Sequence, residues 1–270
     1  MIAERVFKCG ECKLNNGQQK VFYDTSENKE DLKVMFLFES PGGEIDTEEK
    51  LEELNRMTPE QVTLEHRKNF DPWPSNYYLI FRELCKTLHH KGYIGNYPNR
   101  LGTDIMKEIY ITDAVKCRGD KKEIEDYRNM NGFSCTELCS DTILKQELDR
   151  LTNLKLIVSF GNWANKALNT LVEMKGPGRL VKQGPALRTL LYEYDLEYYQ
   201  QFCRTSIKEH GKVYDFDYKY PNGQTTTIKN IHLYHPSWFY NTNRCLGKAN
   251  KASIREKLLI ESIEWCFSKI

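Results

Sequence analysis

The chain has 270 residues, and its 39 Lys and Arg against 38 Asp and Glu give a net charge of +1, which excludes a global field that attracts nucleic acid. Hydrophobic residues make up 40% of the chain, enough for the core of one large domain or two small ones and too many for a disordered protein. The longest apolar run, Val34 to Phe38, is far too short to span a membrane, and residues 1–8 lack a signal-peptide core, so we expect a cytoplasmic or nucleoid-associated protein.

Apolar segments of strand length alternate with helical patterns along the chain. The predicted strands lie at residues 33–39, 108–115, 154–160 and 231–234. The predicted helices begin near Thr58 and Ser75 or span residues 134–151, 163–174 and 252–267. Because strand–helix–strand alternation implies a parallel sheet, we expect an α/β fold, a three-layer α/β/α domain around a short four-stranded parallel sheet.

Two segments fall outside this alternation. Residues 175–185 contain three glycines and two prolines among basic residues, which predicts a loop. Aromatic residues alternate with polar ones from Tyr214 to Tyr220, a Pro-Asn-Gly turn follows, and residues 225–228 resume the pattern, which predicts a β-hairpin. We therefore expect a single domain over residues 1–270, with an insertion at about residues 175–230.

Polar residues follow each predicted strand at its carboxyl end. The four ends read Glu39-Ser40-Pro41-Gly42, Asp113, Gly161-Asn162 and His235-Pro236-Ser237. In an open parallel sheet, ligands bind beyond the carboxyl ends of the strands. The sequence therefore predicts that these residues line one cleft.

Four segments occur in the order seen in the uracil-DNA glycosylase superfamily: Phe38–Gly42, Tyr110–Cys117, Val158–Gly161 and His235–Ser237. Together with the cysteines, they most resemble its iron–sulfur branch, family 4, and the similarity runs from Cys9 to Ser237. The resemblance implies a uracil-DNA glycosylase-like fold and a DNA glycosylase, a hydrolase that cleaves the N-glycosidic bond of a flipped, deaminated base in base-excision repair. We expect single- or double-stranded DNA as the partner, no membrane partner and a monomeric chain.

Five of the nine cysteines are candidate metal ligands: Cys9, Cys12, Cys117, Cys135 and Cys139. The resemblance implies a structural [4Fe-4S] cluster held by four of them. We favour Cys139 as the fourth ligand, because Ser134 and Glu137 predict a capped helix start before it, and Cys135 is the alternative. Zinc in the same four-thiolate site, or reduced structural cysteines, are the alternatives to the cluster. The remaining cysteines are expected to be packing residues: Cys85, Cys203, Cys245 and Cys266.

A glycosylase must stabilise the anionic base that departs, and a histidine donor beside the base carbonyl can do so. We assign this role to His235, with a structural residue as the alternative. His232 falls on the opposite strand face from His235 and is expected to be structural. The resemblance implies that Glu39 places the attacking water, and a carboxylate there also balances oxocarbenium-like charge. The alternative for Glu39 is a loop acid that caps a nearby helix.

Asp113 stands where the uracil-cleaving members of the family have asparagine, whose amide donates to O4 and accepts from N3–H of the base. An ionised aspartate repels O4 but accepts from the exocyclic amine of a cytosine-like base, whereas a protonated one can donate. The sequence therefore leaves the excised base open. The other substrate-binding candidates are Ser40, Pro41, Gly42 and Ser237, with Trp73 as the stacking ring and Phe70 as its alternative.

Three sets of basic residues flank the predicted cleft and are candidates for phosphate anchors. They are Lys116, Arg118, Lys121 and Lys122; Arg179 and Lys182; and Arg244, Lys248 and Lys251. Two other functions stay open at this point. One is a catalytically divergent iron–sulfur module of the same fold that binds nucleic acid or protein, and the other is a zinc-stabilised α/β protein with no glycosylase activity.

Overall fold

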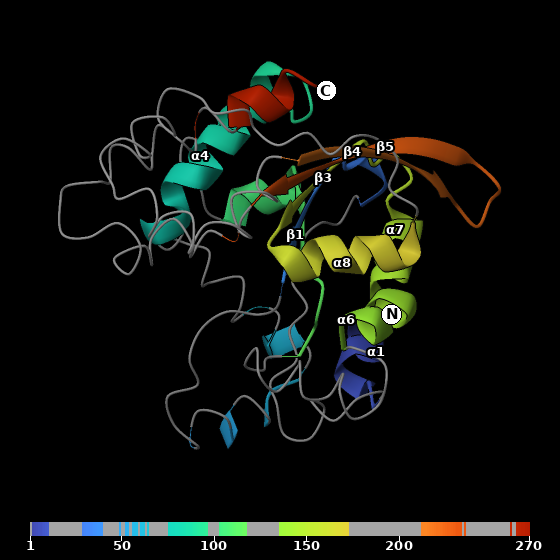
Figure 1. Ribbon diagram of the computed structural model, residues 1–270. Coiled ribbons are helices and arrows are strands. Elements are labelled where there is room, and N and C mark those ends of the chain that lie inside the picture. The colour runs from blue at the N-terminus through green and yellow to red at the C-terminus, as the bar shows by residue number, and fades with distance from the viewer. Residues whose placement is uncertain are drawn as a thin grey trace, which may run out of the picture.

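The computed structural model describes residues 2–10, 29–39, 75–96, 103–117, 135–172, 212–233 and 263–270, short pieces between residues 49 and 64, and residues 235 and 260. A five-stranded sheet forms its middle layer (Figure 1). The strands are β1 (Val34–Phe38), β2 (Tyr110–Asp113), β3 (Leu156–Phe160), β4 (Lys212–Lys219) and β5 (Thr225–Leu233). Their spatial order is β2-β1-β3-β5-β4.

Four strands of the sheet, β2, β1, β3 and β5, run parallel, and β4 pairs antiparallel with β5 at one edge. The predicted α/β class and the parallel arrangement of four strands are therefore confirmed, and the sheet as a whole is mixed. The predicted count of four strands is wrong, because the hairpin belongs to the same sheet.

The hairpin joins the sheet because its second strand and the predicted fourth parallel strand are one continuous strand, β5. Lys229 and Asn230 had interrupted the apolar pattern between them. In the structure these two polar residues stay within the strand, because the Lys229 ammonium pairs with Asp215 at 3.0 Å and Asn230 donates to Asn165 at 3.2 Å. Pairing β4 with this long strand completes the mixed sheet.

The helices with defined bounds lie on both faces of this sheet (Figure 1). They are α1 (Ile2–Lys8), α4 (Ser75–His90), α6 (Cys135–Cys139), α7 (Lys145–Arg150) and α8 (Asn162–Leu171). Short 3-10 helices span Lys29–Asp31 and Thr103–Lys107, and residues 263–267 are helical. The helices predicted from Ser75 and over residues 163–174 are confirmed, the second being shorter, and the helix predicted over 252–267 is confirmed for its last turn.

One face of the sheet packs against α4 and the C-terminal helix. Alternate strand residues point to this face, because successive side chains of a strand lie on opposite sides. Phe38 of β1 stacks on Phe160 of β3 with ring centroids 4.7 Å apart, and Phe81 of α4 meets both rings edge-on at 5.8 Å. Full burial of the Phe81 and Phe160 rings stabilises the fold by about 1.5–3 kcal/mol each.

The other face packs against α7 and α8. Met35 and Leu37 of β1 and Ile157 of β3 point to this side, together with Leu148 of α7 and Leu168 of α8. One apolar cluster thus lies on each face of the sheet, between the strands and the helices that cover them. This agrees with the expected layers of helices on both sides of a sheet.

The helix predicted over residues 134–151 is interrupted by a π-helical turn at Ser140–Leu144, which separates α6 from α7. Two hydroxyls accompany the change: Ser140 Oγ donates to the Thr136 carbonyl at 2.7 Å, and Thr142 Oγ1 donates to the Leu138 carbonyl at 2.6 Å. Such bonds compete with the backbone ladder and bend helices. The predicted helix is therefore confirmed over residues 135–150, with a π-helical turn in its middle that the prediction did not include.

The predicted helix start at Thr58 shows the expected reciprocal cap. The Thr58 amide donates to Gln61 Oε1 at 2.8 Å, and the Gln61 amide donates to Thr58 Oγ1 at 3.3 Å. Across the described residues, no helix has the length and apolar character that crossing a membrane requires.

Candidate functional site

The sheet order places a topological switch point at the carboxyl ends of β1 and β3. After β1 the chain adds β2 on one side of β1. The later strands β3, β4 and β5 all lie on the other side of β1. In open α/β sheets such a point is where ligands bind. Phe38 pairs with Asp113 and Phe160 pairs with Leu233, so the four parallel strands end at the same edge. Glu39, Asp113 and Gly161 therefore lie at the same end of the sheet, and His235 comes two residues after β5. That these residues line one cleft stays a prediction.

Glu39, the residue after β1, reaches across to the start of α8. Its Oε1 accepts a hydrogen bond from the Trp163 amide at 3.2 Å. Gly161 lies between β3 and α8 with φ of +90°, and a Cβ on it would lie 2.3 Å from the Glu39 carboxylate. Glu39 therefore caps α8, as the alternative interpretation of this residue predicted, and its role toward water stays a prediction.

Asp113 is the last residue of β2 and is only 2% exposed. The segment after it continues along β1, because the Ala114 amide donates to the Phe38 carbonyl at 2.8 Å and the Val115 amide donates to the Glu39 carbonyl at 3.0 Å. The end of β2 is thus fixed against the end of β1, which brings Asp113 beside the switch point.

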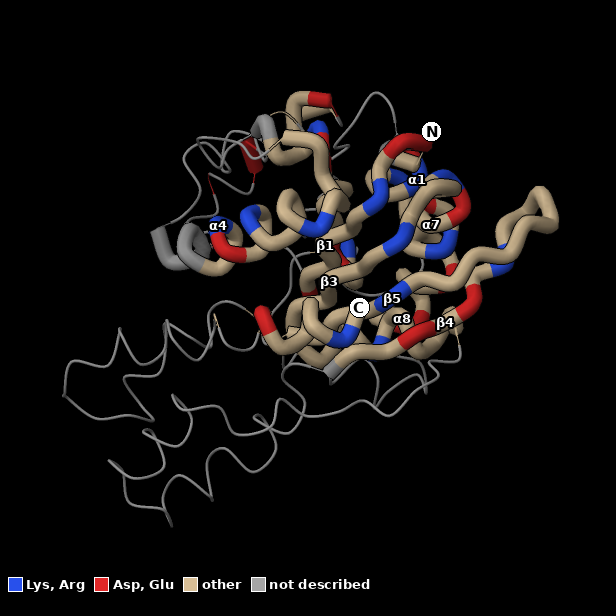
Figure 2. The backbone as a smooth tube through the Cα atoms, turned by 90° about the horizontal axis from the view of Figure 1, so that it is seen from above, with Lys and Arg blue, Asp and Glu red and all other residues tan. Residues whose placement is uncertain are grey.

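Lys116 was predicted to anchor a phosphate, and this prediction is wrong. Its side chain is buried and forms an ion pair with Glu147 of α7 at 2.7 Å. The sequence carried one signal for this partner, because Glu147 falls among Leu144, Leu148 and Leu151 on the apolar face of the predicted helix. The described charges of both signs are interspersed along the backbone (Figure 2). The other candidate phosphate anchors lie outside the described residues.

His235 follows β5 and is partly buried. Burial lowers the pKa of its imidazole from 6.5 to about 4, because desolvation disfavours the charged ring. The ring is therefore neutral at neutral pH. His232, which was expected to be structural, is buried inside β5 with Nδ1 3.3 Å from the Ser159 hydroxyl of β3.

Three of the candidate ligand cysteines lie in one buried cluster. Cys117, Cys135 and Cys139 pack together, and Trp163 packs against them. Cys9 lies after α1, where it lines a hollow of about 330 Å³ together with Thr142 and Ile143 of the π-helical turn. The π-helical turn begins directly after Cys139, so the hollow borders residues that follow the cysteine cluster in sequence.

The described cysteines offer the donor atoms that a thiolate-bound group requires, and a shared site for them stays a prediction. Iron–sulfur clusters and structural zinc both take cysteine thiolates. Within the described ranges, no three His, Cys, Asp or Glu side chains are close enough together to hold a single metal ion. Cys135 and Cys139 are both buried on α6, so the choice between them stays open.

The remaining predicted site residues lie outside the described residues, and their roles stay predictions. They are Cys12, Ser40, Pro41, Gly42, Phe70, Trp73 and Ser237.

Comparison with known proteins gives no family assignment: no family model matches the chain, and no curated protein sequence matches it. The resemblance to the glycosylase superfamily therefore rests on the four motifs and the cysteines. The fold itself is that of an α/β protein with a mainly parallel five-stranded sheet.

Proposed function

We propose that this chain is a DNA glycosylase of the uracil-DNA glycosylase superfamily, which hydrolyses the N-glycosidic bond of a base flipped out of DNA. The observation that supports the proposal is the order of the parallel strands, because Glu39 and Asp113 lie at the carboxyl ends of the neighbouring strands β1 and β2, beside the switch point, and His235 follows β5 on the far side of β3. These residues come from three strands that are far apart in sequence. An extruded base is a small, flat ligand, and open α/β sheets bind their ligands beyond the carboxyl ends of the strands at a switch point.

The chemistry assigns a role to each of the three side chains. His235, whose ring is neutral at neutral pH, would donate a hydrogen bond to the carbonyl oxygen of the departing base and stabilise its negative charge. Glu39, fixed at the start of α8, would place the attacking water and balance positive charge on the sugar. Asp113 would read the edge of the base. Substrate contacts would come from Ser40, Pro41, Gly42 and Ser237, with Trp73 stacked on the base.

The cysteines would hold a [4Fe-4S] cluster as a structural element, with zinc as the alternative. The ligands would be Cys9, Cys12, Cys117 and Cys139, or Cys135 in place of Cys139. Such a group, when bound, supplies a cross-link between the N-terminal segment, the end of β2 and α6, and hydrolysis of the glycosidic bond needs no redox step.

The test is a cleavage assay with the full chain. Single- and double-stranded oligonucleotides carry one uracil, cytosine, hypoxanthine or mismatched thymine, and alkali then breaks the strand at abasic sites. We expect an alkali-sensitive product that falls by about 10²- to 10³-fold in His235→Ala, as for the loss of one transition-state donor. His90→Ala, at the exposed end of α4, is the matched control and should keep full activity. Product that is undiminished in His235→Ala would contradict the proposal.

The capping contact of Glu39 favours a second candidate, a binding module of the same fold without catalysis. In that case the only role of Glu39 is to stabilise the start of α8. The second candidate predicts no abasic product on any of these substrates and retained binding of the oligonucleotides or of a protein partner.

A further inference from the structure

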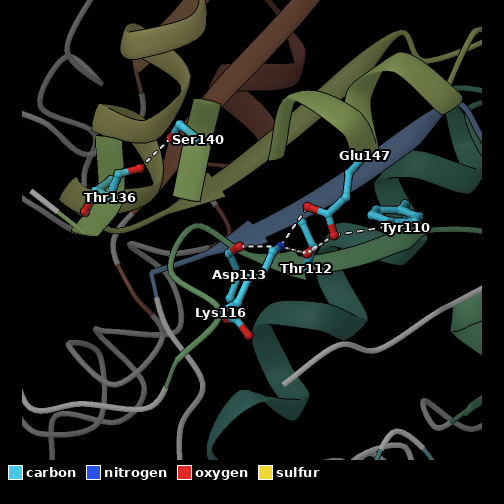
Figure 3. Close-up of polar contacts among 7 residues, drawn as sticks. All are labelled: Tyr110, Thr112, Asp113, Lys116, Thr136, Ser140 and Glu147. Atoms are coloured by element: carbon cyan, nitrogen blue, oxygen red, sulfur yellow. Dashed lines mark hydrogen bonds and ion pairs between the residues drawn. The ribbon is translucent and has the colours of Figure 1, made fainter. Parts of the chain in front are cut away.

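A buried polar network lies between β2 and α7 (Figure 3). Its centre is the ion pair of Lys116 and Glu147, whose side chains are 2% and 0% exposed and whose Nζ and Oε2 atoms lie 2.7 Å apart. Glu147 Oε1 also accepts hydrogen bonds from the Thr112 hydroxyl at 2.8 Å and from the Tyr110 hydroxyl at 3.1 Å. Both carboxylate oxygens of Glu147 are therefore engaged.

The Lys116 ammonium uses all three of its donors within this network. One goes to Glu147, one goes to the Thr112 hydroxyl, and one goes to the Asp113 carbonyl at 2.6 Å. The last bond folds the side chain back onto the end of its own strand. A charge-assisted bond to a backbone carbonyl in a buried site is strong and directional.

Lys116 also stands between two residues with proposed roles. Asp113 precedes it by three positions, and Cys117 follows it directly. On the other side of this segment, the amides of Ala114 and Val115 are bonded to the end of β1. The segment from Asp113 to Cys117 is therefore fixed from two sides, by β1 through its amides and by Lys116 through the Asp113 carbonyl.

Fold stability alone does not require a buried ion pair. Removing both charges from water is costly, and well-packed apolar side chains often replace such a pair without loss of stability. Apolar replacements cannot supply the hydrogen bond to the Asp113 carbonyl. What the ion pair adds beyond stability is thus the hydrogen bond that fixes the position of the backbone at the end of β2.

We propose that Lys116, held in place by Glu147, is a positioning residue that sets the location of Asp113 and Cys117 at the carboxyl edge of the sheet. The effect on base recognition rests on the proposed glycosylase function, whereas the effect on the backbone does not. The structural step is tested first and independently of activity.

Amide hydrogen exchange, measured by NMR on the full chain, reports on the segment directly. We compare the wild type with Lys116→Met, Glu147→Leu and the double variant, and we measure global stability by urea denaturation. In the double variant we expect the urea midpoint to return close to that of the wild type, while exchange of the Ala114 and Val115 amides is at least 10-fold faster. The amides of the β4–β5 hairpin are the internal reference and should be unchanged. Restored stability together with wild-type exchange at these two amides would overturn the proposal.

Glu147→Gln keeps the test decisive if the double variant does not fold. It preserves the side-chain shape and the bond from Lys116 to the Asp113 carbonyl, and it removes the negative charge. At urea concentrations that give equal residual stability, only Lys116→Met should accelerate exchange of Ala114 and Val115. Equal acceleration in both variants would show that the pair acts through stability alone and would overturn the proposal.

The glycosylase assay then tests the link to Asp113. In the double variant we expect the ratio of rates on the preferred base and on the next best base to fall at least 10-fold. An unchanged ratio in a variant with fast exchange would overturn the part of the proposal that concerns Asp113. Absence of any glycosylase activity in the wild type would remove the proposed function, while the exchange experiment still decides the structural part.

Discussion

The Glu39 carboxylate occupies the space that a side chain on Gly161 would need: a Cβ on Gly161 would lie 2.3 Å from it. The two residues follow neighbouring strands, β1 and β3, at the switch point of the sheet. Gly161 also has φ of +90°, a conformation that residues with a side chain rarely adopt. Glycine is therefore required twice at this position, once by the backbone and once by Glu39.

Gly161→Ala should destabilise the fold by about 2–6 kcal/mol. The positive φ contributes about 1–3 kcal/mol, and the contact with Glu39 adds about 1–3 kcal/mol of overpacking. Gly223→Ala is the matched control, because Gly223 has φ of +86° and a Cβ on it would meet no described atom within 4 Å. Its cost should be limited to the backbone contribution. Urea denaturation of both variants measures the two free energies of unfolding.

A second variant separates the two causes at Gly161. In a Glu39→Ala background, Gly161→Ala should cost only about as much as Gly223→Ala, because the clash is gone. The same cost in both backgrounds would show that Glu39 does not lie against Gly161.

Lys116→Met should lower the free energy of unfolding by about 3–5 kcal/mol, because it leaves Glu147 charged and buried without its counter-ion. Adding Glu147→Leu should recover most of this loss. Lys145→Met is the control, since Lys145 pairs with Asp149 at 3.1 Å with its own side chain largely in water. That exposed pair should contribute less than about 1 kcal/mol. A small cost of Lys116→Met, similar to that of the control, would contradict the buried pair.

Much of the fold could be predicted from local sequence patterns. The run Val34–Phe38 becomes an interior strand that pairs on both sides, and Thr58 and Ser75 begin helices where the sequence predicted them. These features depend on neighbours in the chain: apolar periodicity, reciprocal caps and glycine turns. The parallel direction of four strands followed from the alternation of strands and helices, whereas their order in the sheet did not.

The features that the sequence did not predict depend on partners far apart in the chain. Lys229 and Asn230 break an apolar pattern, yet β5 continues through them, with the Lys229 ammonium bonded to Asp215 and the Asn230 side-chain amide donating to Asn165. Lys116 is buried because Glu147, 31 residues away, neutralises it. Such pairings depend on which helix covers which strand, and a single sequence does not contain that information.

The stability of the fold should depend on the titration of His235. Its pKa is about 4 in the folded state and near 6.5 when unfolded, so the unfolded chain binds the proton first as the pH falls. The contribution of the neutral, buried His235 ring to the free energy of unfolding is thus complete above about pH 6.5. It is lost progressively as the pH falls to about 4. The loss is on the order of 3 kcal/mol.

Urea denaturation at pH 7.5 and pH 4.5 measures this dependence. His235→Asn should lose less stability than the wild type between the two values, because its side chain does not titrate. His90→Ala should follow the wild type, since His90 is exposed. Parallel pH profiles for the wild type and His235→Asn would show that the buried ring makes no such contribution.

Iron and sulfide analysis of protein purified without oxygen should separate the ligand cysteines from the packing cysteines. We expect Cys117→Ala to lose the bound iron, because Cys117 lies in the buried cluster with Cys135 and Cys139. Of Cys135→Ala and Cys139→Ala, only the variant that removes the fourth ligand should do the same.

Cys85→Ala is the control for these variants. Cys85 lies on α4, in the core on the other face of the sheet, where desolvation raises the pKa of its thiol to about 12 and disfavours the thiolate that metals bind. This variant should keep its iron and lose only the packing of one small side chain. Iron that disappears equally from Cys85→Ala and Cys117→Ala would point to general unfolding rather than to ligand loss. Zinc in place of iron in the wild type would select the zinc alternative, because both groups take the same four thiolates.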